Sequence, residues 1–173
     1  MQYSGTEVFF KHDDLIVSKT DLKGKITYAN HTFLEVAGDQ ESEVVGQPHN
    51  LIRHVNMPRT VFEYLWLTIP KGEEVFAYVV NKAKNGDYYW VIAHVTPSWK
   101  QGEIIGYHST RRVPNPNTIK TVIEPLYDQL LSIEAKNSSP KGAIQDGLSA
   151  LTGILNDKNI TYNKLLASLM KDD

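Results

Sequence analysis

The fold is decided by residues 75–97, which read VFAYVVNKAKNGDYYWVIAHVTP. Asn85-Gly86 is the strongest short hairpin signal in the chain, because both residue types accept the positive φ angles of a two-residue turn. After the turn, alternate residues fall on one face of a strand, namely Tyr89, Val91, Ala93 and Val95. The stretch therefore predicts two long antiparallel strands, since so short a turn cannot join parallel ones.

Outside this hairpin, three further runs have the composition of strands: residues 15–21, 25–29 and 104–112. Helical spacing or cap residues mark three segments between the second and third strands: residues 30–37, 41–45 and 58–69. Asn30 is a suitable N-cap for the first of them, and Pro58 opens the last. The order of elements predicts an α+β fold, with a five-stranded antiparallel sheet and short helices on one face.

The composition of the chain changes near residue 117. All three Trp, all five Phe, all six His and seven of the nine Tyr lie in residues 1–117. The connector Val113-Pro-Asn-Pro-Asn117 cannot continue a strand or a helix. Beyond it, apolar residues recur at helical spacing, Pro125 should kink or restart the first helix, and Thr161 can cap the last. We expect a globular domain of residues 1–117 and a helical extension of residues 118–173.

The overall composition excludes several classes of protein. Eighteen Lys and Arg against twenty Asp and Glu leave a formal net charge of −2, without the basic excess of a nucleic-acid-binding protein. No apolar run reaches the length of a membrane span, and the first residues do not resemble a secretory signal. Cysteine is absent, which excludes disulfides, zinc–thiolate sites and cysteine nucleophiles. These features predict a soluble, cytoplasmic protein.

The densest cluster of chemically unusual residues is Leu51-Ile-Arg53-His54-Val-Asn56-Met57-Pro58, with Trp66 two helical turns further on. Arg53 offers a planar fork suited to phosphate, and His54 can stack or donate a hydrogen bond. Both precede the N-terminus of a helix, where backbone N–H groups favour an anion. The combination suits a ligand with both a phosphate and a flat ring. The alternative is that Arg53 and His54 are ordinary surface groups of a loop.

Other chemistry has weaker support in the sequence. Asn81, at the end of a strand, has an amide that can match the polar edge of a uracil-like ring or bond to the following turn. No two of the six histidines have the spacing of helical metal ligands, and a haem ligand among them is only a lesser alternative. The motifs of nucleotide hydrolases, metalloproteases and serine hydrolases are missing, so we do not expect an enzyme.

Several motifs, in the right order, resemble those of a PAS domain. The run TDLKGKITYANHTF at residues 20–33 is similar to the opening of that domain, and residues 81–91 with Thr96-Pro97 are similar to its central hairpin. A narrower resemblance, to the flavin-binding PAS domain of bacterial aerotaxis receptors, covers about residues 8–131. It is carried by Leu51-Ile-Arg-His54, Met57-Pro58, Leu65-Trp66, Gly106-Tyr107, Arg111-Arg112 and Ile123-Glu-Pro-Leu-Tyr127.

This resemblance implies that the domain binds FAD and uses it as a redox or oxygen sensor. The flavin-binding positions of the family correspond to Arg53, His54, Asn56 and Trp66, and Asn81 matches an asparagine common to flavoprotein PAS domains. The flavin ring is expected to pack against Trp66 with its polar edge at Asn81. The diphosphate is expected near Arg53 and His54.

The chain also departs from the family. Where the family usually has Arg-His-Pro-Asp, this chain has Arg53-His54-Val55-Asn56. The missing carboxylate removes a charge partner for Arg53, which should weaken or change flavin binding. No transmembrane pair follows the domain, so we expect either a fragment or a free-standing sensor that passes its signal to an unidentified partner protein. The resemblance to PAS domains also implies a homodimer. Light-sensing flavin domains of this fold bond a cysteine to the flavin, and the lack of cysteine leaves redox sensing as the flavin role.

A competing hypothesis is a PAS module that binds no flavin. Val55 and Asn56 would then mark a lost site, and the interior would hold side chains or a small metabolite. Dimerisation or interaction with another protein would be the function of such a module. The helical extension supports this alternative too, because its apolar faces suit contact with a partner.

Overall fold

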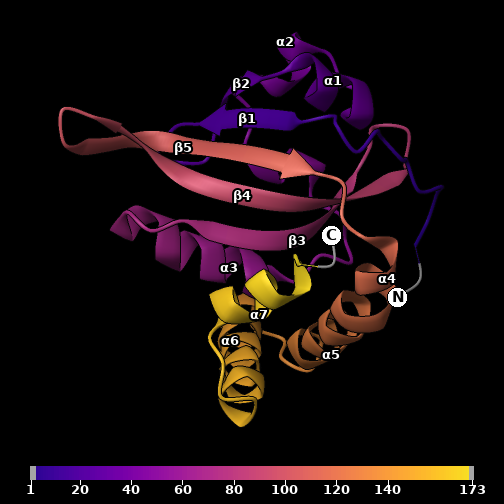
Figure 1. Ribbon diagram of the computed structural model, residues 1–173, viewed down its shortest axis with the longest axis vertical. Helices are drawn as coiled ribbons and strands as arrows, with labels where there is room; N and C mark the ends of the chain where they lie inside the picture. The colour runs from indigo at the N-terminus through magenta and orange to yellow at the C-terminus, as the bar shows by residue number, and fades with distance from the viewer. Residues whose placement is uncertain (1–2, 172–173) are drawn as a thin grey trace. The chain divides into compact units, whose positions relative to one another are not determined.

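The computed structural model describes residues 3–171, and its central element is a five-stranded sheet (Figure 1). In spatial order the strands are β2 (Ile26–Ala29), β1 (Ile16–Thr20), β5 (Glu103–Arg112), β4 (Tyr88–Lys100) and β3 (Val75–Lys82). Every neighbouring pair is antiparallel. The predicted α+β fold with a five-stranded antiparallel sheet is confirmed. The loop of residues 83–87, which contains Asn85-Gly86, joins β3 to β4, and Gly86 has a φ of 94°. Asn85 does not have a positive φ, so the connection is longer than the two-residue turn that the sequence indicated.

The helical segments fall into two groups along the chain. Between β2 and β3 lie α1 (His31–Ala37), α2 (Glu41–Val44), the 3₁₀ turn η1 (His49–Ile52), α3 (Arg59–Thr68) and the 3₁₀ turn η2 (Ile69–Lys71). After β5 come α4 (Pro116–Thr118), the π-helical turn η3 (Ile119–Ile123), α5 (Glu124–Glu134), α6 (Pro140–Asp157) and α7 (Tyr162–Leu169).

Pro125 affects the first helix after the connector, as its residue type predicts. The backbone runs helically from α4 into α5, but the turn before the proline widens into the π-helical η3. Proline has no N–H, and its ring crowds the carbonyl one turn earlier, so a wider turn relieves the clash. The helix restarts at Glu124 with Pro125 in its first turn.

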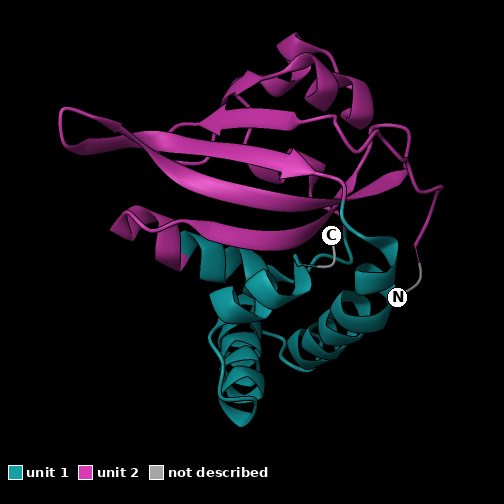
Figure 2. Ribbon diagram, in the orientation of Figure 1, with its two compact units in different colours: residues 1, 55–66, 114–173 teal, residues 2–54, 67–113 magenta. Residues whose placement is uncertain are grey.

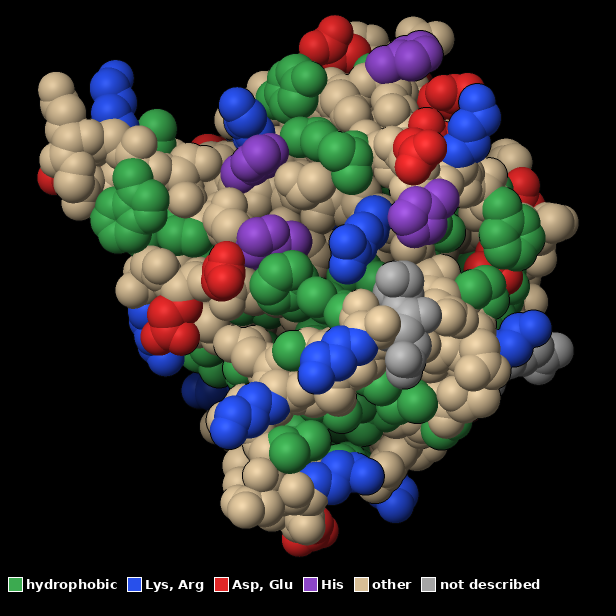
Figure 3. All heavy atoms as spheres, viewed as in Figure 1, with side chains coloured by type: hydrophobic (Ala, Val, Ile, Leu, Met, Phe, Trp, Pro, Cys, Tyr) green, Lys and Arg blue, Asp and Glu red, His purple; other side chains and the backbone are tan. Residues whose placement is uncertain are grey.

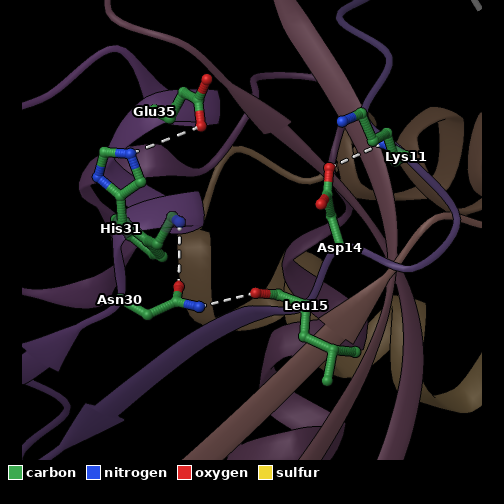
Figure 4. Close-up of polar contacts among 7 residues, drawn as sticks. Lys11, Asp14, Leu15, Asn30, His31 and Glu35 are labelled. Carbon is green, nitrogen blue, oxygen red and sulfur yellow. Dashed lines mark hydrogen bonds and ion pairs between the residues drawn. The ribbon is translucent and has the colours of Figure 1, made fainter.

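Asn30 joins the first strand to the first helix. Its Oδ1 accepts hydrogen bonds from the Phe33 N–H at 3.0 Å and the Val17 N–H at 2.9 Å. Its Nδ2 donates to the Leu15 carbonyl at 2.7 Å, and Figure 4 shows the side chain between Leu15 and the start of α1. The predicted N-cap is confirmed, and the same side chain also satisfies backbone groups at the edge of β1.

The chain forms two compact units, coloured separately in Figure 2. The sheet unit comprises residues 2–54 and 67–113, and the helical unit comprises residues 55–66 and 114–173. Most of α3 therefore belongs to the helical unit, although it lies between β2 and β3 in the sequence. The division into a domain of residues 1–117 and an extension of residues 118–173 stays a prediction.

The inner face of the sheet holds several polar residues of β3 and β5. The strand register aligns the alternate residues of β4 that the sequence predicted on one face with Asn81, Ser109 and Arg111 of its neighbours. Short helical segments contribute to this face, since the Phe33 ring of α1 lies 5.7 Å from the Arg111 guanidinium. Figure 3 shows charged side chains of both signs on the visible surface, in keeping with the small net charge.

The packing around Gly106 offers a test of the sheet. A Cβ at this position would lie 2.2 Å from the Thr20 carbonyl oxygen. We expect Gly106→Ala to lower the free energy of unfolding by about 1–3 kcal/mol, because backbone atoms cannot move aside cheaply. Gly153→Ala, in α6 with no atom within 4 Å of the new Cβ, is the matched control. It should be neutral or stabilising by about 0.5–1 kcal/mol. Urea denaturation followed by circular dichroism measures both changes, and equal stability of the two variants would contradict this account.

Candidate functional site

Three of the five predicted site residues lie together in the sheet unit. Arg53, directly after η1, forms an isolated antiparallel bridge with Asn81 at the end of β3. The His54 N–H donates to the Val80 carbonyl at 3.4 Å. The loop after η1 thus runs along the end of β3, although 28 residues separate Arg53 from Asn81 in the sequence. His54 and Asn81 are buried, whereas Arg53 is partly exposed.

The other two predicted residues, Asn56 and Trp66, belong to the helical unit. Asn56 precedes α3 and is partly exposed, and Trp66 lies near the end of α3 with 36% of its surface exposed. The sequence reasoning gave no sign that a compact unit boundary falls between His54 and Val55. That these five residues bind a ligand stays a prediction.

His54 lies among aromatic side chains of the sheet unit. The Tyr3 ring is stacked on Tyr88, with centroids 4.2 Å apart, and lies 5.5 Å from the His54 ring. Backbone hydrogen bonds hold the N-terminal segment there, because the Val8 N–H donates to the Tyr88 carbonyl at 2.7 Å. Burial, and secondarily the charge of Lys82, lowers the pKa of His54, so this imidazole is neutral at pH 7.

A cluster of buried polar atoms without protein partners lies on the inner face of the sheet. Within residues 3–171 these atoms are Asn81 Nδ2, Tyr89 OH, Ser109 Oγ and Arg111 Nη1. The register puts Asn81 directly opposite Tyr89, and all four residues on one face. Buried polar side chains are almost always hydrogen-bonded, so four unsatisfied ones on one face indicate a surface built to meet another polar group.

Arg111 is the most unusual member of this cluster. It is 3% exposed, and none of the ion pairs among the described residues includes it. Its Nη2 donates to Ser18 Oγ at 2.9 Å and to His49 Nε2 at 2.6 Å. Because a guanidinium only donates, His49 must accept through Nε2 and carry its proton on Nδ1. The second terminal nitrogen, Nη1, keeps its hydrogen-bonding capacity for another group.

Burial shapes the protonation of the whole cluster. The His49 residue keeps some solvent exposure, but its Nε2 edge lies against the guanidinium. Burial, and then the charge of Arg111, lowers the pKa of His49 to about 3. Burial lowers the pKa of Arg111 to about 10, so it remains a cation at pH 7. Burial also raises the pKa of Tyr89, which keeps its phenol neutral.

Sequence reasoning missed Arg111, His49, Tyr89, Ser18 and Ser109 as members of the site. A signal was present for Arg111, because it falls on the strand face that its apolar neighbours predict to be buried. An arginine at such a position is rarely placed there for packing. No comparable signal marked His49, whose partner lies 62 residues further along the chain.

The arrangement is suited to binding and less to side-chain catalysis. Nowhere in residues 3–171 do three or more potential metal ligands come together. The cluster instead offers several donors and one fixed positive charge within an apolar surround. Such a cluster can recognise a flat heteroaromatic group that presents acceptor atoms and gains negative charge.

Comparison with known proteins assigns the family. Residues 15–113 match the family described as the PAS fold, and the chain belongs to that family. Its members are sensor domains, which typically signal and do not catalyse reactions. The resemblance to PAS domains is thereby confirmed.

The relatives are longer proteins. The chain is 42% identical over 132 residues to the aerotaxis receptor of Escherichia coli (strain K12), a match covering 76% of this chain and 26% of the receptor. It is 29% identical over 97 residues to the nitrogen fixation regulatory protein of Klebsiella pneumoniae, covering 56% of this chain and 20% of that protein. The chain thus spans about a quarter or less of the length of these relatives.

A solved structure shows the same fold at low sequence identity. The light-state structure of the blue-light photoreceptor Aureochrome1 LOV aligns with a TM-score of 0.56 at 19% identity. The alignment covers 66% of this chain and 91% of that one.

The described residues contain no helix that is both long and apolar enough to cross a bilayer.

The neutral His49 makes stability depend on pH in a defined direction. Its pKa is about 3 in the folded protein against an ordinary value of 6.5, so the unfolded chain binds more protons between these pH values. Stability therefore falls as the pH falls through this window, by up to about 1.4 kcal/mol per pH unit from this residue. We expect His49→Gln to remove that contribution and flatten the curve. Urea denaturation at several pH values from about 7 to about 4 measures the slope.

The matched control is His31→Gln, which removes an exposed imidazole at the start of α1. Wild type and His49→Gln curves that run parallel over the whole window would show that His49 does not titrate with folding.

Proposed function

We propose that this PAS domain binds FAD and acts as a redox sensor, with residues 1–117 as the sensor and residues 118–173 as the extension that carries the signal. The observation that supports it best is the set of unsatisfied buried groups of Asn81, Tyr89, Ser109 and Arg111 on one sheet face. Leaving each of them unpaired costs free energy, and a ligand with complementary acceptors removes that cost. The aerotaxis receptor at 42% identity supports a sensor of the same kind.

The residues present suit the two chemical ends of FAD. Asn81 offers an amide that donates and accepts, and Arg111 and Tyr89 offer donors, which together fit the carbonyls and ring nitrogens of a flavin. Arg53 and His54, beside Asn81 through the bridge to β3, suit the diphosphate. The proposal also includes Asn56, just before α3, and Trp66, near the end of α3, as flavin-binding residues.

FAD, when bound, supplies reversible reduction, in which the ring gains electrons and protons. The part of the protein is electrostatic. Arg111 holds a fixed positive charge in a buried environment, where it stabilises added negative charge more than it would in water. His49 stays neutral and accepts from Arg111, so it orients the guanidinium without adding a second charge. The chain has no cysteine, so a cysteine–flavin adduct is not part of the proposal.

We also propose that the sensor works as a homodimer with a further protein as its output partner. Trp99 and Ile105, on the long β4–β5 hairpin, are 56% and 52% exposed. Large exposed apolar residues of this kind suit contact with another protein surface. If no flavin is bound, the same surface favours the alternative of a cofactor-free interaction module.

The absorbance spectrum of freshly purified protein tests the cofactor. We expect the visible bands of oxidised flavin, and release of FAD on denaturation. Added FAD should restore the bands to protein that has lost them. Protein without these bands that also fails to take up added FAD would refute the proposal. A band typical of haem would refute it equally.

Substitution of two neighbouring arginines tests whether the buried polar groups of the sheet bind FAD. Arg111→Gln removes the buried cation, and we expect FAD affinity to fall about tenfold or more, since charged hydrogen bonds are worth about 1.5–3 kcal/mol. Arg112→Gln is the matched control, because Arg112 is exposed and lies on the opposite face of β5. Titration of the stripped protein with FAD, followed by flavin fluorescence, measures both affinities. Equal FAD affinities in the two variants would contradict the proposal that Arg111 binds the flavin.

A further inference from the structure

The N-terminus of α3 is capped by a residue from a distant helix. Glu134, the last residue of α5, accepts hydrogen bonds from the Arg59 N–H at 3.2 Å and the Thr60 N–H at 2.9 Å. Its Oε1 also accepts from Thr60 Oγ1 at 2.8 Å. The first N–H groups of a helix have no partner within the helix, and a carboxylate there also complements the helix dipole. One side chain of α5 thus completes the start of α3.

Two further contacts join the same stretch of α3 to the rest of the extension. Gly147 of α6 lies so close to Thr60 that a Cβ on the glycine would meet Thr60 Oγ1 at 1.9 Å. One turn further along α3, the Tyr64 ring lies 4.5 Å from the ring of Tyr162 in α7. Thr60 and Tyr162 are both buried. All three long helices of the extension therefore contact residues 59–64, and all of these contacts lie within the helical unit.

The Thr60–Glu134 contact is sensitive to small changes. Thr60 has no exposed surface. Loss of Glu134 would leave the hydroxyl and N–H of Thr60 and the N–H of Arg59 without this acceptor. The Thr60 hydroxyl is also held against Gly147 of α6. All three hydrogen bonds go to one carboxylate, so a movement that separates Glu134 from the start of α3 would break them together.

We propose that Thr60, Glu134 and Gly147 form a latch through which the helical extension responds to the segment that carries Asn56 and Trp66. The part of this proposal that concerns flavin rests on the proposed function. A change of ligand or redox state at Asn56 and Trp66 shifts the start of α3 and alters how tightly α5, α6 and α7 are held. Linkage makes the coupling reciprocal, so opening the latch also changes affinity for the ligand.

The first experiment tests the latch without any cofactor. Amide hydrogen exchange of the full chain is compared for Glu134→Gln, which keeps the shape but loses the charge and one of the two acceptor oxygens, and for Glu124→Gln at the opposite end of α5. We expect at least about tenfold faster exchange in α5, α6 and α7 for Glu134→Gln, and unchanged exchange in β3, β4 and β5. Equal exchange in the two variants would overturn the proposal.

A second pair of variants covers the case in which Glu134→Gln does not fold. Thr60→Ser keeps the hydroxyl, and Thr60→Val replaces it with a methyl group of similar size. We expect wild-type exchange in the extension for Thr60→Ser and faster exchange for Thr60→Val. The same exchange rates in Thr60→Ser and Thr60→Val would overturn the proposal. So would a loss of protection in β3, β4 and β5 of Thr60→Val as large as its loss in the extension.

The second experiment tests the coupling to flavin. In wild type loaded with FAD, reduction should change exchange in α5, α6 and α7, and Glu134→Gln should abolish that response while the visible flavin bands remain. A redox response of equal size in both proteins would overturn the coupling. If wild type takes up no FAD, the proposed function fails, while the first experiment still decides whether the latch exists.

Discussion

The guanidinium of Arg111 sits in the interior of the sheet unit, and within the described chain it forms no ion pair with a carboxylate. A buried cation is costly unless other groups replace the water it loses. Ser18 from β1 and His49 from η1 accept its hydrogen bonds, and the Phe33 ring of α1 faces it. Three elements must therefore converge on one side chain, and His49 must stay neutral for this convergence to be stable.

The same constraint prepares the interior for a ligand. Arg111 uses Nη2 to hold Ser18 and His49, while its Nη1 is unpaired, as are Asn81 Nδ2, Tyr89 OH and Ser109 Oγ on the same face. The protein thus keeps a buried positive charge and several donors in fixed positions. Fixed dipoles and charges of this kind stabilise a ligand that gains electron density more effectively than mobile water does. The flavin proposed above, reduced in place, would be such a ligand.

The helical unit follows a different principle, in which backbone groups at a helix start are satisfied from far along the chain. Glu134 completes the N-terminus of α3, and Gly147 allows α6 to approach Thr60 closely. Because Asn56 and Trp66 lie in this unit, while Arg53, His54 and Asn81 lie in the sheet unit, the residues that resemble the flavin-binding positions are not confined to one compact unit.

The sequence by itself determined the features that depend on near neighbours. These are the β3–β4 hairpin at Asn85-Gly86, the cap at Asn30 and the altered helix before Pro125, because turn angles, caps and proline sterics act within a few residues. Only the tertiary structure decided what each face meets: His49 lies 62 residues from Arg111 in sequence, and Glu134 lies 74 residues from Thr60. Periodicity specifies which way a side chain points, but the partner of a buried polar group is set by long-range packing, which no local pattern encodes.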